Sequence, residues 1–218
     1  MSGIFEQKIA PGKSMVNRFL PVIILVGLLF HITLNVLIIC RLEYRFSYYS
    51  LLDLCGIIAG LYVTDLISNF IHWLGDCNIP WHNRFLIRFH ELSMQHHKRP
   101  ADILKQGFFD IRGNIAFFYS PQLILAYVLA PVGGISTPMV FFLVVNSNLM
   151  LLAHSIHKAC HKRNAGFPLA VLQSMRLIIP SAYHLAHHSP PFNRNFSAIN
   201  GWSDPLFEKL VAYWSKRC

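Results

Sequence analysis

Charged residues are scarce in this chain of 218 residues, where Asp, Glu, Lys and Arg together make up 13%. An ordinary soluble domain carries about twice that fraction, roughly 25%. Apolar residues make up 54%, more than a soluble fold of this size can bury. Intrinsic disorder is excluded as well, because disordered chains are poor in aromatic residues and this one has 13%. The composition therefore predicts a membrane protein.

Cysteine and glutamate are also sparse, and their spacing excludes several metal sites. The five cysteines form no Cys-x-x-Cys, which argues against a zinc ribbon or a thioredoxin-type site. None of the four glutamates has a histidine three residues later, as a ferritin-like di-iron site requires. His90-Glu91 is followed by Met94 where a zinc protease of the His-Glu-x-x-His type needs its second histidine.

Long apolar runs predict an all-α membrane protein with four transmembrane helices in one domain. After a polar tail at 1–18, a single domain covers 19–215, with spans at about 19–40, 51–73, 115–132 and 138–153. Gly56 and Gly60 form a small-xxx-small pair that favours close helix packing. The apolar stretch 167–179 is too short to span and is expected to lie along the membrane interface as a helix.

Four spans place the N-terminus, the 74–114 loop and the region 154–215 on one side of the membrane. That side holds 17 of the 19 Lys and Arg residues, and Arg41 and Arg45 lie on the other, so the first side is expected to be cytoplasmic. We expect a multi-pass protein of the endoplasmic reticulum in a eukaryote, or of the inner membrane in a bacterium. The net charge of +9 includes no basic run that would track a nucleic acid, which leaves anionic lipid head groups as its expected partner.

The 12 histidines outnumber the 10 acidic residues, and all but His31 lie on or at the edge of the predicted cytoplasmic side. They fall in groups: His72; then His82, His90, His96 and His97; then His154, His157 and His161; then His184, His187 and His188. A lone histidine is more often structural, but four groups at one membrane face predict a histidine-rich cap of short helices that binds metal.

The end of the second predicted span carries a polar stripe. Asp65, Asn69, His72 and Asp76 are spaced i, i+4, i+7 and i+11, which places them on one face of a helix. Asp65 is expected to accept the second N–H of His72, an arrangement typical of metal-bound imidazoles. A hydrogen bond between helices is the simpler alternative.

The number and type of these side chains favour a particular metal. Structural zinc prefers four ligands, usually including cysteines. A haem within the bilayer needs histidines deep in facing spans, and only His31 is deep. About eight imidazoles suit two iron ions that leave room for oxygen. A di-iron site is the remaining prediction.

The motifs resemble those of the plasmanylethanolamine desaturase family (Kua/CarF-like), which also includes the plant plastid desaturase of phosphatidylglycerol acyl chains. The resemblance covers about residues 60–210 and rests on Phe70-Ile-His-Trp73, His96-His97, Ile156-His-Lys-x-x-His161 and Pro180-x-x-x-His-x-x-His-His-x-x-Pro191. It implies a membrane di-iron lipid desaturase that uses O2 and forms the vinyl ether of a plasmalogen from a 1-alkyl glycerophospholipid. An external electron donor such as cytochrome b5 or a ferredoxin is implied too.

The resemblance carries a set of site residues onto this sequence. The implied iron ligands are His72, His96, His97, His157, His161, His184, His187 and His188. His90 and His154 have no clear counterpart and are possible additional ligands. Asp65, Asn69 and Asp76 are expected to orient the ligands by hydrogen bonding. Lys98, Arg99 and Arg194, beside the motifs, are expected to contact the lipid phosphate, although each is also consistent with a solvated charge.

The sequence departs from the family at positions that bear on the substrate. Met94-Gln95 stand before the double histidine, where the ether-lipid members usually carry Arg-Glu. Two alternatives therefore stay open. In the first, the chain desaturates or hydroxylates phospholipid acyl chains. In the second, it is a non-enzymatic membrane protein that binds metal or lipid.

Overall fold

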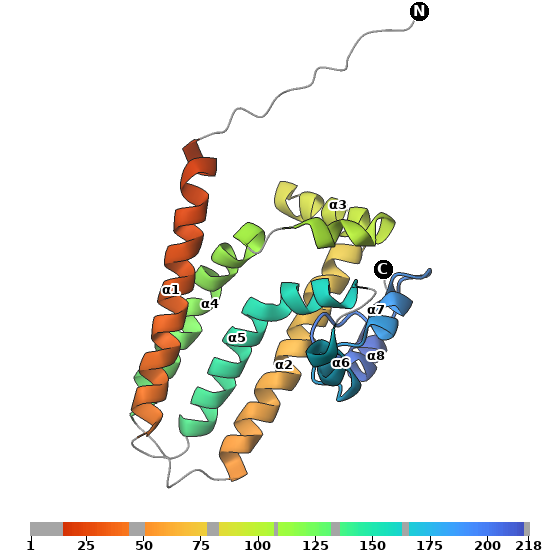
Figure 1. Cartoon of the computed structure of the whole chain (residues 1–218). Helices are drawn as coiled ribbons and strands as arrows, with labels where there is room; N and C mark the ends of the chain where they lie inside the picture. Colours follow the sequence, from red (N-terminus) through yellow and green to blue (C-terminus); the bar gives the residue numbers. More distant parts are fainter. Residues whose placement is uncertain are drawn as a thin grey trace, which may run out of the picture.

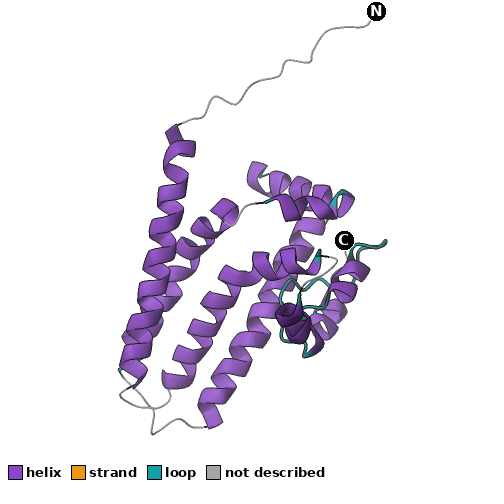
Figure 2. Cartoon of the chain, in the orientation of Figure 1, coloured by secondary structure: helices purple, strands orange, loops and turns teal. Residues whose placement is uncertain are grey.

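The computed structural model describes residues 15–43, 51–77, 83–106, 109–131, 136–162 and 166–215. Within these ranges every regular element is helical (Figure 2). The elements in chain order are α1 Met15–Glu43, α2 Leu51–Asp76, α3 Arg84–Lys98, the 3-10 helix η2 Pro100–Lys105, α4 Phe109–Leu129, α5 Ser136–Cys160, α6 Phe167–Ser174, α7 Ser181–His187 and α8 Asp204–Ser215.

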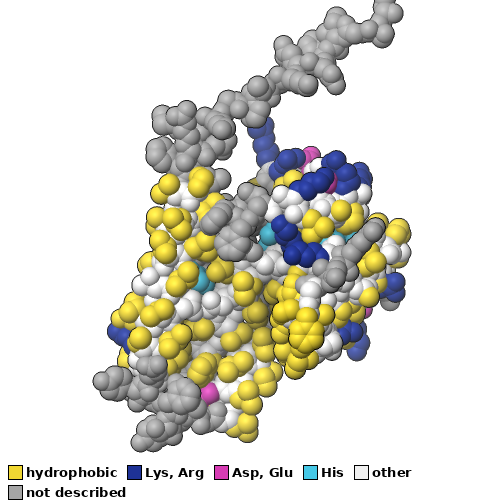
Figure 3. All heavy atoms as spheres, in the orientation of Figure 1, with side chains coloured by type: hydrophobic (Ala, Val, Ile, Leu, Met, Phe, Trp, Pro, Cys, Tyr) yellow, Lys and Arg dark blue, Asp and Glu magenta, His cyan; other side chains and the backbone are white. Residues whose placement is uncertain are grey.

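Three helices are long and apolar enough to cross a membrane, at Pro21–Leu42, Leu51–Asp76 and Thr137–Cys160. Their outward side chains are apolar, as the exposed Leu29 and Ile58 illustrate, because lipid replaces water around them (Figure 3). These helices agree with the first, second and fourth predicted spans. The predicted span at 115–132 falls on α4, which begins earlier, at Phe109, and whose apolar part is the shorter Phe118–Leu129. A fourth crossing stays a prediction.

The bundle is held by close packing of α5 with α2 and α4, and of α4 with α1 (Figure 1). A side chain at Gly56 would overlap the carbonyl of Pro138, and one at Gly60 would lie 2.9 Å from Cβ of Val145. The predicted small-residue pair therefore permits the approach of α2 to α5. On the other side, Leu34 and Ile38 of α1 meet Leu123 of α4 in a buried apolar cluster.

The short elements gather around the C-terminal ends of α2 and α5 (Figure 1). Ile179 and Ile199 are fully buried against Ile156 and Cys160 in the last turns of α5. α8, which the sequence analysis did not anticipate, packs Phe207 against Phe196. The polar C-terminal ends of α2 and α5 thus lie directly against the histidine-rich region.

One prediction about this region was too long. The helix expected over 167–179 ends at Ser174, where the backbone turns through Arg176 at φ 56°. The amide of Leu177 then donates to the carbonyl of Leu172, which closes the helix in the manner of a Schellman turn. The residues that follow run into α7 and place its histidines over α5.

Candidate metal centre

The eight histidines carried over from the family resemblance come together in space with one carboxylate. They arrive from four helix ends: α2, α3, α5 and α7. The first group consists of His96, His157, His161, His184 and His188, and the second group consists of His72, Asp76, His97 and His187. Within each group, the possible ligand atoms all lie within 4.8 Å of one another.

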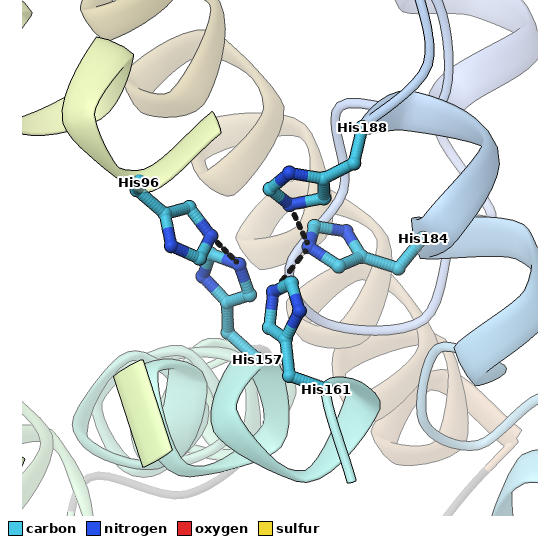
Figure 4. A group of neighbouring side chains, drawn as sticks. All are labelled: His96, His157, His161, His184 and His188. Atoms are coloured by element: carbon cyan, nitrogen blue, oxygen red, sulfur yellow. Dashed lines mark hydrogen bonds between the residues drawn. The ribbon is translucent and has the colours of Figure 1, made fainter. Parts of the chain in front are cut away.

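The first group is built from imidazoles alone (Figure 4). Nε2 of His96 lies 3.1 Å from Nε2 of His157. Nε2 of His184 lies 3.1 Å from the Nε2 atoms of both His161 and His188. Ring nitrogens that converge in this way have few protons to share between them, so a cation is the natural centre of the group.

The second group is organised around Asp76. Its Oδ1 lies 2.9 Å from Nε2 of His97, and its Oδ2 lies 3.1 Å from Nε2 of His187 and 3.8 Å from Nε2 of His72. Asp76 was predicted only to orient the imidazoles, yet it lies among the possible ligands. The Ser93 hydroxyl donates to Oδ1 of Asp76 over 2.6 Å.

Backbone carbonyls fix two rings of the second group. Nδ1 of His72 lies 2.7 Å from the carbonyl of Phe196, and Nδ1 of His187 lies 2.7 Å from that of Arg194. A carbonyl only accepts, so each Nδ1 carries a proton, and in the neutral ring Nε2 then keeps its lone pair. This is the tautomer that binds a metal through Nε2.

Burial holds three imidazoles of the first group neutral. Burial, followed by the neighbouring His161, lowers the pKa of His96 to about 3. Burial, followed by His187, lowers the pKa of His161 to about 4. Burial lowers the pKa of His184 as well, with the imidazoles of His72 and His188 adding to the effect. A protonated imidazole cannot bind a metal, so the site keeps its donors available at neutral pH.

Unpaired buried atoms show that the residues fit a metal ion. Oδ2 of Asp76 and Nε2 of His187 are both buried, and neither makes a hydrogen bond in the part of the chain that the structure describes. Such atoms are costly without a partner, and a cation between them would satisfy both. Imidazole with carboxylate is a donor set that iron accepts.

Asp65 does not bond to His72, contrary to the prediction, because the Phe196 carbonyl occupies that position. The buried carboxylate instead accepts the hydroxyls of Ser197 and Ser203 and the amides of Asn200, Gly201 and Ser203. Asn69 Nδ2 donates to the Ser203 hydroxyl over 3.1 Å. Both residues thus hold the segment 196–203, which presents the carbonyl of Phe196 to His72.

The remaining predicted residues lie around the centre. His90 is outside both groups, and its Nδ1 lies 2.8 Å from the carbonyl of Gly75. His154 also belongs to neither group and lines a cavity. Arg99 lines the same cavity, whereas Lys98 and Arg194 are exposed on the surface. His82 lies outside the described residues.

This cavity has a volume of about 770 Å³ and lies between α2, α3, η2, α4 and α5. Its walls are mainly apolar, with Leu92, Ile103 and Met150 among them. It reaches His72 of the second group and His96 and His157 of the first. A ligand in the cavity would therefore contact both groups at once.

Sequence reasoning missed the groups that act through the backbone. The contacts of the Phe196 and Arg194 carbonyls could not be predicted from the sequence, because every residue has a backbone carbonyl. The serines at 197 and 203 also passed unnoticed, although their spacing around Asn200-Gly201 is typical of a tight polar turn.

Comparison with known proteins identifies the family of this chain. Residues 61–216 match the model of the lipid desaturase domain family. A plasmanylethanolamine desaturase of Myxococcus xanthus is 27% identical over 95% of this chain and 76% of its own length, and plasmanylethanolamine desaturase 1 of Mus musculus is 26% identical over the same shares. Fatty acid desaturase 4-like 2, chloroplastic, of Arabidopsis thaliana is 30% identical over 70% of this chain and 54% of its own. No solved structure matches the chain. The chain belongs to the lipid desaturase domain family, as an integral membrane oxidoreductase.

Proposed function

We propose that this protein is a di-iron desaturase that uses O2 and external electrons to introduce a double bond into the alkyl ether chain of a glycerophospholipid, forming a vinyl ether. The observation that carries the proposal is the contact between the two ligand groups and one apolar cavity. His72, His96 and His157 line that cavity, so a hydrocarbon chain inside it would lie beside both groups.

The reaction explains why a metal centre is needed. Side-chain acids and bases cannot remove hydrogen from an unactivated methylene group. Two iron ions, when bound by the two groups with O2, would supply the oxidising power to take two hydrogens from adjacent carbons. The chain's own part is to hold neutral imidazoles in place, through Asp76 and the carbonyls of Phe196 and Arg194, and to exclude water from the substrate's carbons.

The cavity fits a lipid better than a small polar substrate. Ile71, Phe89 and Phe118 add to its apolar lining, and its size lies in the usual range for ligand pockets, about 300–1,000 Å³. Polar side chains gather at α3 and η2, where Arg99, Asp102 and Gln106 line the wall. Of the three predicted phosphate contacts, Arg99 is therefore the one this cavity supports.

The position of Arg99 supports a reaction close to the head group. It follows His96 by three residues, so its backbone lies within about one helical turn, roughly 5 Å, of that ligand. A lipid whose phosphate binds Arg99 would present its first few chain carbons to the metal centre. This placement favours a double bond beside the ether oxygen over one in the middle of the chain.

An acyl substrate is the second candidate, and the plastid relative's name supports it. An ether lipid substrate has the wider support, because the two plasmanylethanolamine desaturases align over 95% of this chain and the plastid protein over 70%. Hydroxylation would use the same centre. A non-enzymatic metal or lipid binder would not need two ligand groups opening on one cavity.

The proposal includes four spans, with the metal centre and both termini in the cytoplasm. α4 supports the fourth span, because it packs against both α1 and α5 within the bundle. Electrons would come from cytochrome b5 or a ferredoxin, since the sequence has no flavin or haem motif of its own. The membrane would be the endoplasmic reticulum or a bacterial inner membrane.

Lipid analysis of cells that express the chain tests the proposal. New vinyl ethers are expected, together with about two irons per purified chain. New acyl double bonds would favour the second candidate, and zinc or no metal would favour the binder. The variant Ala153→Phe tests the role of the cavity itself, because it adds a large side chain to the cavity wall beside His154 without removing a ligand. It should keep its iron and lose at least about tenfold in turnover.

A further inference from the structure

The outer face of α6 is apolar and has no protein partner among the described residues. The exposed fraction of Phe167 is 82%, and that of Met175, just after the helix, is 61%. Leu169 and Gln173, one turn apart, are the only half-buried residues of this helix. An exposed apolar patch of this kind marks an interaction site. In the space-filling view it appears as a hydrophobic patch over α6 (Figure 3).

Contacts on the inner face fix the depth of α6. Leu169 packs on the cluster that contains Ile156 and Cys160, at the end of the span Thr137–Cys160. His157, in the same turn, lies with its ring centroid 5.5 Å from that of His72 on α2. α6 therefore lies at the level of the metal centre, where the apolar segments of two spans end.

The lipid-facing surface of α2 continues to this level. Phe70, two residues before His72, is 43% exposed. This large apolar side chain belongs to a span, so the apolar layer of the membrane extends to its depth. The outer face of α6 therefore lies at the same depth in the membrane as the lipid-facing surface of α2.

We propose that α6 is a membrane-surface helix, whose outer face inserts into the boundary between head groups and acyl chains of the leaflet on the histidine side. The flanking charges suit that position. Lys162 before the helix and Arg176 after it are exposed, and the Arg176 guanidinium lies 4.7 Å from the centroid of the Tyr183 ring. Cations at the ends of a short apolar helix match lipid phosphates.

This contact with lipid bears directly on the metal centre. Nε2 of Gln173 donates to the carbonyl of Ile179 over 3.3 Å and to the Ser181 hydroxyl over 3.2 Å. Ser181 begins α7, which carries His184 and His187. The helix that rests on the membrane surface is therefore bonded to the start of the helix that supplies ligands to both groups.

Spin labels on the full-length protein in vesicles of phosphatidylcholine and phosphatidylglycerol test the proposal. Cys40, Cys55, Cys77 and Cys218 are first replaced by Ala, and the buried Cys160 is kept. Met175→Cys is compared with Ile58→Cys on the lipid face of α2 and with Lys105→Cys on η2, where the charged side chain is 80% exposed. Collision of each label with O2 and with a water-soluble nickel chelate is then measured.

The label at Met175 should give an O2-to-nickel collision ratio several-fold above that at Lys105, and at or below that at Ile58, which lies in the interior of its span. A ratio equal to that at Lys105 would place α6 in water and overturn the proposal. Exclusion of both reagents would show that protein, such as a second copy of the chain, covers the helix, and would overturn it too.

Limited proteolysis of the unmodified chain in the same vesicles gives a second readout. Trypsin should cut after Lys105, whose side chain is 80% exposed, several-fold faster than after Arg176. Equal rates of cleavage at the two sites would contradict insertion of α6. Neither measurement depends on desaturase activity, so failure of the proposed function would not affect the result.

Discussion

The two ligand groups lie side by side but differ in charge and in how they are held. The first group has five imidazoles that contact one another through Nε2, and Nδ1 of both His184 and His188 is buried without a hydrogen-bond partner among the described residues. The second group has three imidazoles and the carboxylate of Asp76. Two of its rings are fixed by backbone carbonyls.

This difference indicates that the two ligand groups would not hold metal ions in equivalent ways. A carboxylate offsets part of a bound cation's charge in a buried site, whereas neutral imidazoles do not. Preset tautomers also lower the cost of assembling the second group, since its rings need not reorient. We therefore expect the second group to depend on its supporting contacts, and the first to depend on the metal itself.

The largest expected effect follows from removing the carboxylate. Asp76→Asn keeps the shape of the side chain but takes away its negative charge and one acceptor oxygen. Iron bound per chain should fall by about half, and turnover by about 100-fold or more. Iron content and turnover of the purified variant check both parts.

The matched control for this substitution is Asp102→Asn, which makes the same chemical change at a carboxylate paired with Lys105 on the surface. It should keep the full iron content. An Asp76→Asn protein with unchanged iron and turnover would show that Asp76 is not a ligand.

A smaller loss is expected from Asp65→Asn, which acts through the segment 196–203. The Asn amide group would face the donors of Ser203, which bond to a carboxylate oxygen in the native chain. The Phe196 carbonyl should then hold His72 less firmly. Iron affinity of the second group should fall about 10–100-fold while that of the first is kept, as chelator competition would measure.

Asp204→Asn is the matched control for Asp65→Asn, because Asp204 is buried beside the same segment. Burial, followed by the charge of Asp65, raises the pKa of Asp204 to about 7. Its carboxyl is therefore largely protonated below neutral pH, where Asn is a close substitute. Equal losses in the two variants would contradict a specific role for Asp65.

The family motifs predicted eight histidines that lie together in the structure, but neither the place of Asp76 among them nor their division between two groups could be predicted. His96 and His97 are adjacent in α3 and belong to different groups, as do His187 and His188 at the end of α7. Successive helical residues point about 100° apart, so a double histidine serves two centres. Which residue faces which centre depends on how the helices pack, and no spacing within one helix reveals it.

The spans could be predicted where the apolar runs are long. The features that were not predicted, the end of α6 and the helix α8, depend on tertiary contacts. The Gly56 and Gly60 pair was predictable because small residues have a direct steric use against α5. The early end of α6 depends on the left-handed backbone at Arg176, a conformation that nothing about arginine favours. α8 went unpredicted because its apolar side chains, such as Phe207 and Val211, match a core formed by distant residues.

The smallest effect concerns pH, and it tests whether the imidazoles of the first group are buried in their neutral form. The folded pKa values of His96 and His161, about 3 and about 4, lie below the unfolded value of roughly 6.5. Between these values the unfolded chain binds more protons, so the free energy of unfolding falls as pH drops from about 6.5 towards 4. The metal-free protein in detergent should therefore show a falling thermal midpoint over this range. His161→Gln removes one of the rings with a lowered pKa and should make the decline shallower. A flat midpoint in the native chain would contradict the buried, neutral state of these imidazoles.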